Sequence, residues 1–366
     1  MKNKKLFTSE SVTSGHPDKI CDIIADSILD EALKQDPLAR MAVECTIKDD
    51  LILIYGEASL NGEINYEQVA LKTIKEIGYT EKYNVLTKVS KQSSEINNAV
   101  YKKENELGAG DQGIMFGYAT NETPELMPLS ISLAHKLAER LEKFRNEKPE
   151  SGIKPDGKTQ VTIEYDDDDN VINIDTILIS TQHREGMTNK EIYDVVYNNI
   201  IAKVIPTDEL KDTKIIINPS GSFVTGGSFG DSGTTGRKIV VDTYGGHGRI
   251  GGGCFSSKDP TKVDRSAAYY SRYVAKSIVA NKLANKCEIQ VSYGIGSVKP
   301  ISIHINCFGT NKIPMSEIYD IVNKNFDFSP YNIIKELDLR RPIYKKTAAY
   351  GHFGREEFSW EKIKKL

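Results

Sequence analysis

One order of elements recurs three times along the chain, and it limits the folds that the chain can adopt. Each time, a helix with apolar residues at helical spacing precedes two β-rich runs joined by a turn, and another helix follows. The helices are expected at 18–35, 66–78, 129–145, 189–203, 261–285 and 316–325. The strand pairs are expected at 41–48 with 51–59, at 161–165 with 171–182 and at 287–294 with 301–308, and a further strand at 215–217. The pattern predicts an α+β fold of three similarly built domains, each a small sheet covered by helices on one face, in a pseudo-threefold arrangement.

The chain length agrees with several domains, because 366 residues are too many for one ordinary core. We expect an N-terminal domain over 1–97, a central domain over 98–222 that starts with a mobile loop, and a C-terminal domain over 223–366. Two polar stretches, 92–107 and 146–160, are predicted to be mobile loops that either cover a binding site or simply connect elements.

Composition predicts a soluble globular protein of the cytoplasm. Apolar residues make up 39% and charged residues 27%, and 48 basic against 51 acidic residues give a net charge of −3. A chain that is acidic overall is not built as a general nucleic-acid or membrane-surface binder. The N-terminus lacks the apolar segment of a signal peptide, and no run approaches the roughly 18 apolar residues of a membrane span. The five scattered cysteines form no CxxC pair, which favours free thiols over a zinc site.

Glycine is concentrated in one part of the chain. Twelve of the 28 glycines fall between Gly221 and Gly253. Basic residues cluster around this segment, namely Arg237, Lys238, Lys258, Lys262 and Arg265. Glycine lets backbone N–H groups approach an anion, and Lys and Arg form charge-assisted hydrogen bonds with phosphate oxygens. The combination favours a polyphosphate site over a solvated surface loop.

Three common nucleotide-binding patterns are excluded. The chain has no Walker GxxxxGK[ST] loop. A GxGxxG occurs at 246–251 after a strand expected at 238–244, but its last glycine enters a polar turn instead of opening a helix, as a dinucleotide site requires. A protein kinase would need HRD and DFG motifs, and neither is present.

The run 10–19 is the second candidate for chemistry. Pro17 suits the first position of a helix and Asp18 suits its positive end, so an ordinary helix start explains both. His16 is more informative, because an imidazole at such an anion-binding end can donate a hydrogen bond to a leaving oxygen. Mg²⁺ that binds with phosphate needs one or two carboxylates. The candidates are Asp18, Asp111, Asp231 and Asp264, whereas 166–169 is interpreted as a solvated hairpin turn.

Several unusual motifs in one order resemble the S-adenosylmethionine synthetase (methionine adenosyltransferase) family. They are 108–113 (GAGDQG), 251–259 (GGGCFSSKD), 15–19 (GHPDK), and similar stretches at 233–238, 259–265 and 347–356. The resemblance implies that methionine sulfur attacks ribose C5′ of ATP and displaces triphosphate, which is then cleaved to phosphate and diphosphate. It also implies three similarly built α+β domains and a homotetramer, a dimer of dimers with sites at the dimer interface.

The resemblance assigns roles residue by residue. His16 would lie beside the bridging O5′ oxygen, and the other residues expected to act in catalysis are Lys158, Arg237, Lys238 and Lys258. The expected ATP contacts are His16, Asp156, Lys158, Phe223, Asp231, Arg237, Lys238, Cys254 and Lys258. The expected methionine contacts are Glu57, Gln92, Asp231 and Lys262. Asp18 and Asp264 would bind Mg²⁺, two ions per site, Glu44 would bind K⁺, and 92–102 would form the gating loop.

Three positions depart from the family pattern. Ser222 stands where an arginine usually precedes the phenylalanine matched by Phe223, which removes one cation near the nucleotide. Cys254 replaces an alanine and places an oxidisable thiol near the site, and Ile250 replaces a histidine. Two other functions stay open: another ATP-dependent small-molecule enzyme, such as a kinase or ligase, and a nucleotide-binding regulatory subunit. The joint presence of His16 and both metal carboxylates argues against a subunit that only binds.

Overall fold

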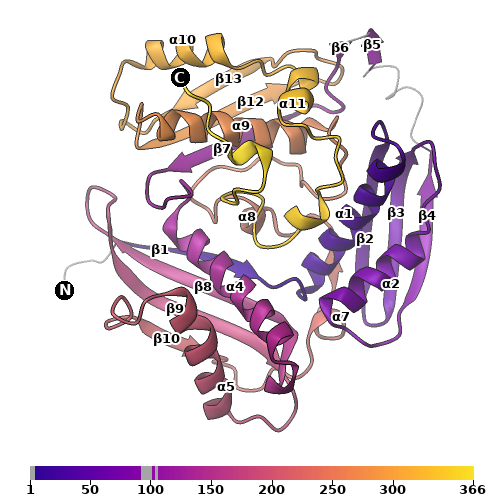
Figure 1. The fold of residues 1–366 in the computed structure, drawn as a ribbon, viewed down its shortest axis with the longest axis vertical. Helices are drawn as coiled ribbons and strands as arrows, with labels where there is room; N and C mark the ends of the chain where they lie inside the picture. Colours follow the sequence, from indigo (N-terminus) through magenta and orange to yellow (C-terminus); the bar gives the residue numbers. More distant parts are fainter. Residues whose placement is uncertain (1–4, 92–100, 104–105) are drawn as a thin grey trace.

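Sheets backed by helices make up the protein, as the computed structural model shows (Figure 1). The structure describes residues 5–91, 101–103 and 106–366. Among these residues, two sheets have four strands and one has three, and β5 (Tyr101–Lys103) and β6 (Glu106–Leu107) form a separate two-stranded ribbon. The predicted α+β class is confirmed.

The N-terminal sheet is built on the first predicted hairpin. β2 (Arg40–Lys48) and β3 (Leu51–Ser59) pair antiparallel across a two-residue turn. After α2 (Tyr66–Ile77) the chain returns as β4 (Asn84–Ser90), which runs parallel to β3. β11 (Gly233–Thr234) pairs with the free edge of β2 and brings the glycine-rich segment to this sheet. The alternation of buried and exposed residues along β2 explains why the period-2 pattern located this hairpin.

The central sheet has the order β1-β8-β9-β10. β1 (Lys5–Val12) pairs antiparallel with β8 (Ile153–Tyr165), which forms the second predicted hairpin with β9 (Val171–His183). β10 (Lys214–Ile217) lies parallel to β9 at the other edge. α4 (Leu129–Glu147) packs on β1 and β8, and its apolar residues form a separate core with this sheet.

Most of the stretch 146–160 is strand, so its prediction as a mobile loop was wrong. A short 3₁₀ turn (Pro149–Ser151) follows α4, and β8 begins at Ile153. The register with β9 shifts between Ile153 and Gly157, and Pro155 lies in this irregular part. Proline donates no ladder hydrogen bond and is tolerated at such irregularities. The proline and glycine content therefore indicated a bulged strand.

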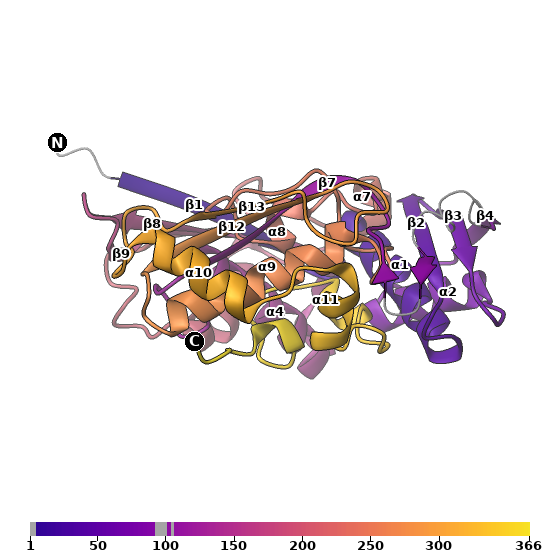
Figure 2. The same ribbon diagram turned by 90° about the horizontal axis from the view of Figure 1, so that it is seen from above.

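The C-terminal sheet has the order β13-β12-β7. β12 (Lys286–Tyr293) and β13 (Ser302–Asn306) form the third predicted hairpin, and β7 (Gly113–Thr120) pairs antiparallel with the other edge of β12. α9 (Val263–Ala280) packs on β7 and β12. In Figure 2 these strands lie along one side of the molecule, and α9 and α10 (Met315–Asn325) both lie on the same face of this sheet.

Side-chain caps mark the starts of two further helices. α5 (Asn189–Val196) starts at a capping box between Thr188 and Glu191 and continues through a π-helical turn (Tyr197–Ile201) into α6 (Ala202–Val204). These three pieces occupy the helix predicted at 189–203. α11 (Pro330–Glu336), capped by the Ser329 side chain, had no counterpart among the predicted helices. No helix among the described residues is long and apolar enough to cross a membrane.

Each sheet takes one strand from a distant part of the chain. β1 is N-terminal but belongs to the central sheet, β7 lies in the central part of the sequence but belongs to the C-terminal sheet, and β11 returns from the C-terminal part to the N-terminal sheet. The cyclic exchange supports a pseudo-threefold arrangement. The ranges 1–97, 98–222 and 223–366 stay a prediction.

The strand expected at 238–244 is instead the short helix α8 (Ile239–Asp242). The backbone N–H of Asp242 donates to the Lys238 carbonyl, and the Thr243 hydroxyl donates back to the Ile239 carbonyl. These local bonds satisfy groups that a strand would offer to a neighbour. The apolar run was too short for its period to separate helix from strand.

α1 (Pro17–Gln35) is buried on its polar face as well as on its apolar face. Its apolar residues join the larger core, which extends through the N-terminal and C-terminal sheets. Its aspartates Asp18, Asp22, Asp26 and Asp30 recur every four residues and are all buried. The helix was predicted as amphipathic from the spacing of its apolar residues. Here the polar side faces protein.

Candidate active site

His16 caps the N-terminus of α1. Its Nδ1 accepts the backbone N–H of Asp18 at 3.2 Å, and its side chain is buried. Burial, with the nearby charges of Lys238 and Lys158, lowers the pKa of His16 to about 3. The imidazole is therefore neutral near pH 7, and with Nδ1 accepting, the proton is assigned to Nε2. The site thus holds a neutral N–H donor beside two cations.

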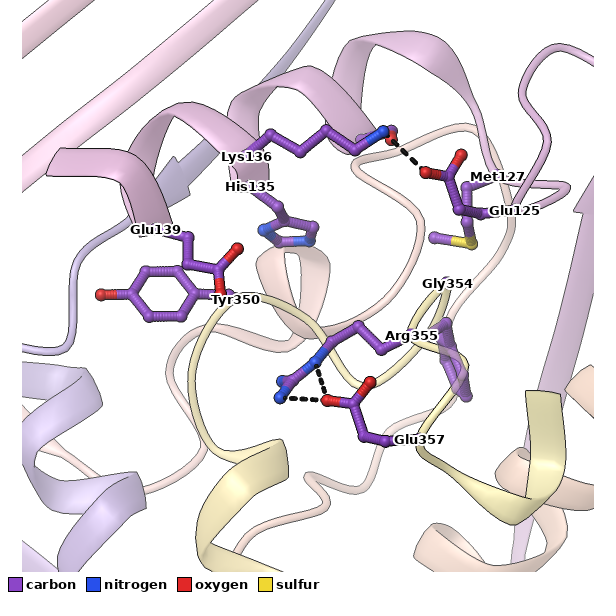
Figure 3. Close-up of a pocket in the computed structure, with 11 residues that line it drawn as sticks. Glu125, Met127, His135, Lys136, Glu139, Tyr350, Gly354, Arg355 and Glu357 are labelled. Carbon is purple, nitrogen blue, oxygen red and sulfur yellow. Dashed lines mark hydrogen bonds and ion pairs between the residues drawn. The ribbon is translucent and has the colours of Figure 1, made fainter. Parts of the chain in front are cut away.

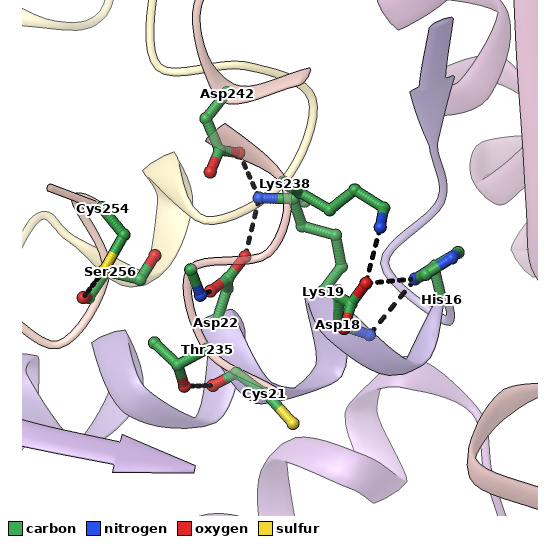
Figure 4. Close-up of polar contacts among 12 residues, drawn as sticks. His16, Asp18, Lys19, Cys21, Asp22, Thr235, Lys238, Asp242, Cys254 and Ser256 are labelled. Atoms are coloured by element: carbon green, nitrogen blue, oxygen red, sulfur yellow. Dashed lines mark hydrogen bonds and ion pairs between the residues drawn. The ribbon is translucent and has the colours of Figure 1, made fainter. Parts of the chain in front are cut away.

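Asp18 is the point where α1 meets the glycine-rich segment (Figure 4). Its Oδ1 accepts the backbone N–H of Thr234 at 3.0 Å, and Lys238 Nζ lies 2.5 Å from its Oδ2. Arg237 lies 3.6 Å from Oδ1 and is half exposed. Burial alone would raise the pKa of Asp18, but the hydrogen bond and charge of Lys238 outweigh it, and the pKa is lowered. The carboxylate is ionised and acceptor-only, which suits a hard cation.

Asp156 and Lys158 enter the same region from the start of β8. Asp156 Oδ2 accepts the N–H of Gly227 at 2.8 Å, at the start of α7 (Gly227–Gly230), and its buried Oδ1 has no protein partner. Burial raises the pKa of Asp156 to about 6. The charges of Lys158 and Asp231 act on both Asp156 and His16, so all four side chains lie in one field. The unpaired Asp156 oxygen is available to a ligand donor.

A second group lies around the start of α9. Lys258 Nζ lies 2.5 Å from Asp264 Oδ2, and Lys262 Nζ lies 2.5 Å from Asp259 Oδ2. All four residues come from the sequence that follows the glycine-rich segment. Lys262 is buried and forms its ion pair with Asp259.

Asp264 explains a glycine in each of two sequence motifs, 108–113 and 251–259. A side chain at Gly253 would place its Cβ about 2.2 Å from the Asp264 carboxyl carbon, and one at Gly113 would lie 3.2 Å from Oδ1. Both glycines leave the space that the carboxylate occupies. The 108–113 and 251–259 motifs, far apart in sequence, thus meet at one carboxylate.

Glu44, Glu57 and Cys254 lie near the N-terminal hairpin. Glu44 is on β2 and accepts the Tyr55 hydroxyl at 3.4 Å, while Glu57 is on β3. Cys254 packs so closely on Gly236 that a Cβ there would lie 2.7 Å from its Sγ. Burial raises the pKa of Cys254 to about 11, which keeps the thiol protonated and weakly reactive near pH 7. The departure to cysteine is thus chemically mild in this structure.

The remaining predicted site residues lie outside the two charged groups or outside the described residues. Gln92 and most of the gating loop at 92–102 lie outside the described residues. Phe223 is half-buried, and its backbone N–H donates to His183 Nε2 at 2.9 Å. Ser222 and Ile250 are exposed, and nothing in the structure explains the change at Ile250. The run 166–169 is a turn, as predicted, in which Asp166 accepts the backbone N–H groups of Asp168 and Asn170.

Sequence reasoning missed four buried charged residues that support the two groups, namely Lys19, Asp22, Asp26 and Asp242. It counted Arg265 among the basic residues of the polyphosphate site, but the structure buries this side chain against Asp26. Lys19 donates to both Asp22 and Asp242 (Figure 4). Arg265 forms a bidentate pair with Asp26 at 2.7 and 2.8 Å. The available signal was the recurrence of aspartate every fourth residue along α1, which puts the carboxylates on one helix face.

A cavity of about 200 Å³ lies between α4 and the C-terminal segment, lined by His135, Tyr350 and Arg355 among others (Figure 3). The backbone N–H of Ser14 donates to the Tyr350 hydroxyl at 3.2 Å, so the cavity lies behind the turn that carries His16. None of the predicted site residues lines it. The predicted site residues converge elsewhere, around the start of α1 and the glycine-rich segment, where His16, Asp18 and Asp156 are buried.

The metal-ligand pattern fits ions held together with phosphate. No group of three or more His, Cys, Asp or Glu side chains in the described part of the chain is arranged to hold a metal alone. Asp18 and Asp264 are instead single carboxylates, each beside a lysine. Mg²⁺ commonly takes one or two carboxylates and completes its shell with waters and substrate phosphates. The donor set therefore fits ions that bind together with a nucleotide.

Comparison with known proteins identifies the family. Models of the S-adenosylmethionine synthetase N-terminal, central and C-terminal domains match residues 4–103, 106–223 and 225–362. A relative from Sorangium cellulosum (strain So ce56), named S-adenosylmethionine synthase, is 53% identical over 368 residues, covering 97% of this chain and 87% of the relative. One of the same name from Clostridium tetani (strain Massachusetts / E88) is 52% identical over 384 residues, covering 99% and 98%. Together with the two charged groups described above, these matches show that the chain belongs to the S-adenosylmethionine synthetase family.

Proposed function

We propose that this enzyme forms S-adenosyl-L-methionine from ATP and L-methionine and then hydrolyses the triphosphate to phosphate and diphosphate. The observation that carries the proposal is the neutral, buried His16 beside the ionised Asp18 and the cations Lys238 and Lys158. A neutral N–H donor among cations suits an oxygen on which negative charge develops.

The first step needs a stabilised leaving group and no base. A lone pair of the methionine sulfur forms the S–C5′ bond while the C5′–O5′ bond breaks, and the electron pair leaves with the triphosphate. His16 Nε2–H donates a hydrogen bond to O5′ as charge develops there. Lys158, Arg237, Lys238 and Lys258 bind the phosphate oxygens. Holding the two reactants in line contributes roughly 7–11 kcal/mol through orientation.

The ions would be held by residues from both groups. Asp18 and Asp264 hold the two Mg²⁺ ions of a site and Glu44 holds K⁺. When bound, the ions neutralise charge on the triphosphate. In the structure Lys238 and Lys258 form ion pairs with these carboxylates. The ionised state of Asp18 supports its assignment as a Mg²⁺ ligand. Phosphate oxygens that draw the lysines away would free the carboxylates for the metal.

The remaining residues bind the two substrates. Asp156, Asp231, Phe223 and Cys254 contact the nucleotide, together with the cations named above. The unpaired Oδ1 of Asp156 supports its part in this set. Glu57, Gln92, Asp231 and Lys262 contact methionine. Lys262 must leave Asp259 to reach the substrate carboxylate, so its ion pair is expected to open on binding.

A homotetramer built from dimers, with the sites at the dimer interface, is part of the proposal. Large apolar side chains are exposed on strands and adjoining loops, as a buried interface requires. They include Leu6, Ile114, Ile295, Ile301 and Phe308. The enzyme is proposed to act in the cytoplasm, without nucleic acid or membrane.

One incubation tests the reaction. Purified protein is mixed with ATP, L-methionine, Mg²⁺ and K⁺, and products are resolved by mass spectrometry and phosphate analysis. S-adenosylmethionine with equal amounts of phosphate and diphosphate is the expected result. Phosphorylated or adenylated product would favour another ATP-dependent enzyme, and ATP binding without product would favour a regulatory subunit.

A further inference from the structure

The aspartates of α1 hold different segments of the chain against one helix face. Asp18 accepts the N–H of Thr234, Asp22 that of Gly236, and Asp26 that of Ser257. Asp30, the last of the four, accepts the N–H groups of Tyr344 and Lys345 at 2.8 and 2.9 Å. We call these four residues the aspartate stripe. All four carboxylates are buried.

Asp22 holds the neighbours of both members of the Asp18–Lys238 pair (Figure 4). Its Oδ2 accepts from Lys19, which directly follows Asp18. Its Oδ1 accepts the N–H of Gly236 at 2.8 Å, two residues before Lys238. One carboxylate thus fixes the helix turn that carries the proposed metal ligand and the loop that carries the proposed phosphate-binding lysine.

Asp242 completes this connection from the other side. The Lys19 ammonium donates to Asp242 as well as to Asp22, and the Asp242 backbone N–H donates to the Lys238 carbonyl at 2.8 Å. Lys19, Asp22 and Asp242 are almost fully buried. Two oppositely directed ion pairs, Asp18–Lys238 and Lys19–Asp242, therefore join α1 to α8.

The same arrangement recurs one turn later, around the second pair. Asp26 binds Arg265, which directly follows Asp264, and accepts the N–H of Ser257, which directly precedes Lys258. Each of the pairs Asp18–Lys238 and Asp264–Lys258 therefore has one buried aspartate of α1 beside it. That aspartate binds a residue close in sequence to the proposed metal ligand and another close to the lysine. Helix packing at one point alone would not require the same bonding pattern beside both pairs.

We propose that Asp22 is a positioning residue that sets the geometry of Asp18 against Lys238 through Lys19, Gly236 and Asp242, so that Mg²⁺ and triphosphate bind productively. The inference rests on the proposed function. Asp22 is too buried to touch either substrate, so its effect is confined to the placement of groups that do.

The test compares Asp22→Ala with Asp30→Ala in the full-length enzyme. Both substitutions remove a buried stripe carboxylate that has two hydrogen-bond donors, but the partners of Asp30 neighbour no proposed ligand. For Asp22→Ala we expect at least a tenfold loss of kcat and at least a fivefold rise in the Mg²⁺ concentration for half-maximal rate. KM for methionine should stay within twofold. Asp30→Ala should keep kcat and the Mg²⁺ midpoint within twofold at a comparable loss of Tm.

The conservative variant Asp22→Asn keeps an acceptor for Gly236 and should restore part of the Mg²⁺ response. Equal Mg²⁺ midpoints and kcat values for Asp22→Ala and Asp30→Ala would overturn the proposal. If Asp22→Ala does not fold, Asp242→Asn decides, because Asp22 still balances Lys19 there. A wild-type Mg²⁺ midpoint and kcat in Asp242→Asn would then reject the inference. Failure of the wild-type protein to make S-adenosylmethionine would instead reject the proposed function.

Discussion

Lys238 Nζ lies 2.5 Å from Asp18 Oδ2, although the two residues are 220 positions apart in the sequence. The contact joins the first turn of α1 to the residue before α8, and both side chains are largely buried. The contact pairs the Lys238 ammonium, a group suited to binding phosphate, with the Asp18 carboxylate, a group suited to binding a metal ion. The two charges of this pair balance each other, and a metal–nucleotide complex that binds here has to exchange these partners.

His16→Asn should leave ATP binding nearly unchanged and lower kcat for S-adenosylmethionine formation by about 10²–10³-fold, the usual cost of losing one donor to a developing oxyanion. Asparagine still caps a helix, so α1 should start normally. Calorimetric ATP binding and product formation measure the two effects separately. The exposed His304→Asn on β13 is the control, and full activity of His16→Asn would remove His16 from the mechanism.

Asp264→Ala should raise the Mg²⁺ requirement by about 10-fold or more, in the range seen when groups that support a metal are lost. The change also frees Lys258 from its partner at 2.5 Å, so ATP binding in the absence of Mg²⁺ should not weaken. A rate titration with Mg²⁺ at saturating substrates measures the shift. An Mg²⁺ curve that overlays the wild type would show that Asp264 is not a ligand.

Acid should destabilise the fold through His135. Burial, with the charges of Lys19 and Arg355, lowers the pKa of His135 from 6.5 to about 3. The unfolded chain therefore binds a proton that the folded chain does not, so this contribution to stability is complete above pH 6.5 and is lost as pH falls toward 3. Between pH 7 and pH 5 the loss is about 2 kcal/mol for this one group.

His135→Gln removes that titration and tests the sign. The variant is less stable at pH 7, because His135 Nδ1 lies 2.8 Å from the Ser11 hydroxyl. Its free energy of unfolding in urea should nevertheless fall by about 2 kcal/mol less than that of the wild type between pH 7 and pH 5. Equal losses in the two proteins would contradict a neutral, buried His135.

Ser257→Gly should stabilise the protein by about 1 kcal/mol. Ser257 has φ of 80°, in the left-handed region that a side chain disfavours, and its buried hydroxyl has no hydrogen-bond partner. Its backbone N–H to Asp26 does not depend on the side chain. A rise in Tm at unchanged kcat is the expected result. A fall in kcat would instead show that the Ser257 hydroxyl takes part in binding.

Most helices and all three hairpins could be predicted because local periodicity sets them. The turn between β2 and β3 and the apolar stripe of α1 depend on neighbours within a few residues. The failures have local reasons too. Pro155 suggested a loop, because a strand accepts a proline there only where its register against β9 shifts. α8 was too short to show a period.

Most of the helices, the three hairpins, the motifs and the residue types of the charged groups could be read from the sequence. Which sheet each of β1, β7 and β11 completes, and which charges meet, depends on how the chain packs. This packing also turned the polar face of α1 inward, where four aspartates bind backbone N–H groups from distant segments. The physical reason is that ion pairing and burial depend on distances set by packing. Periodicity tells which residues share a face, but not whether water or protein covers it.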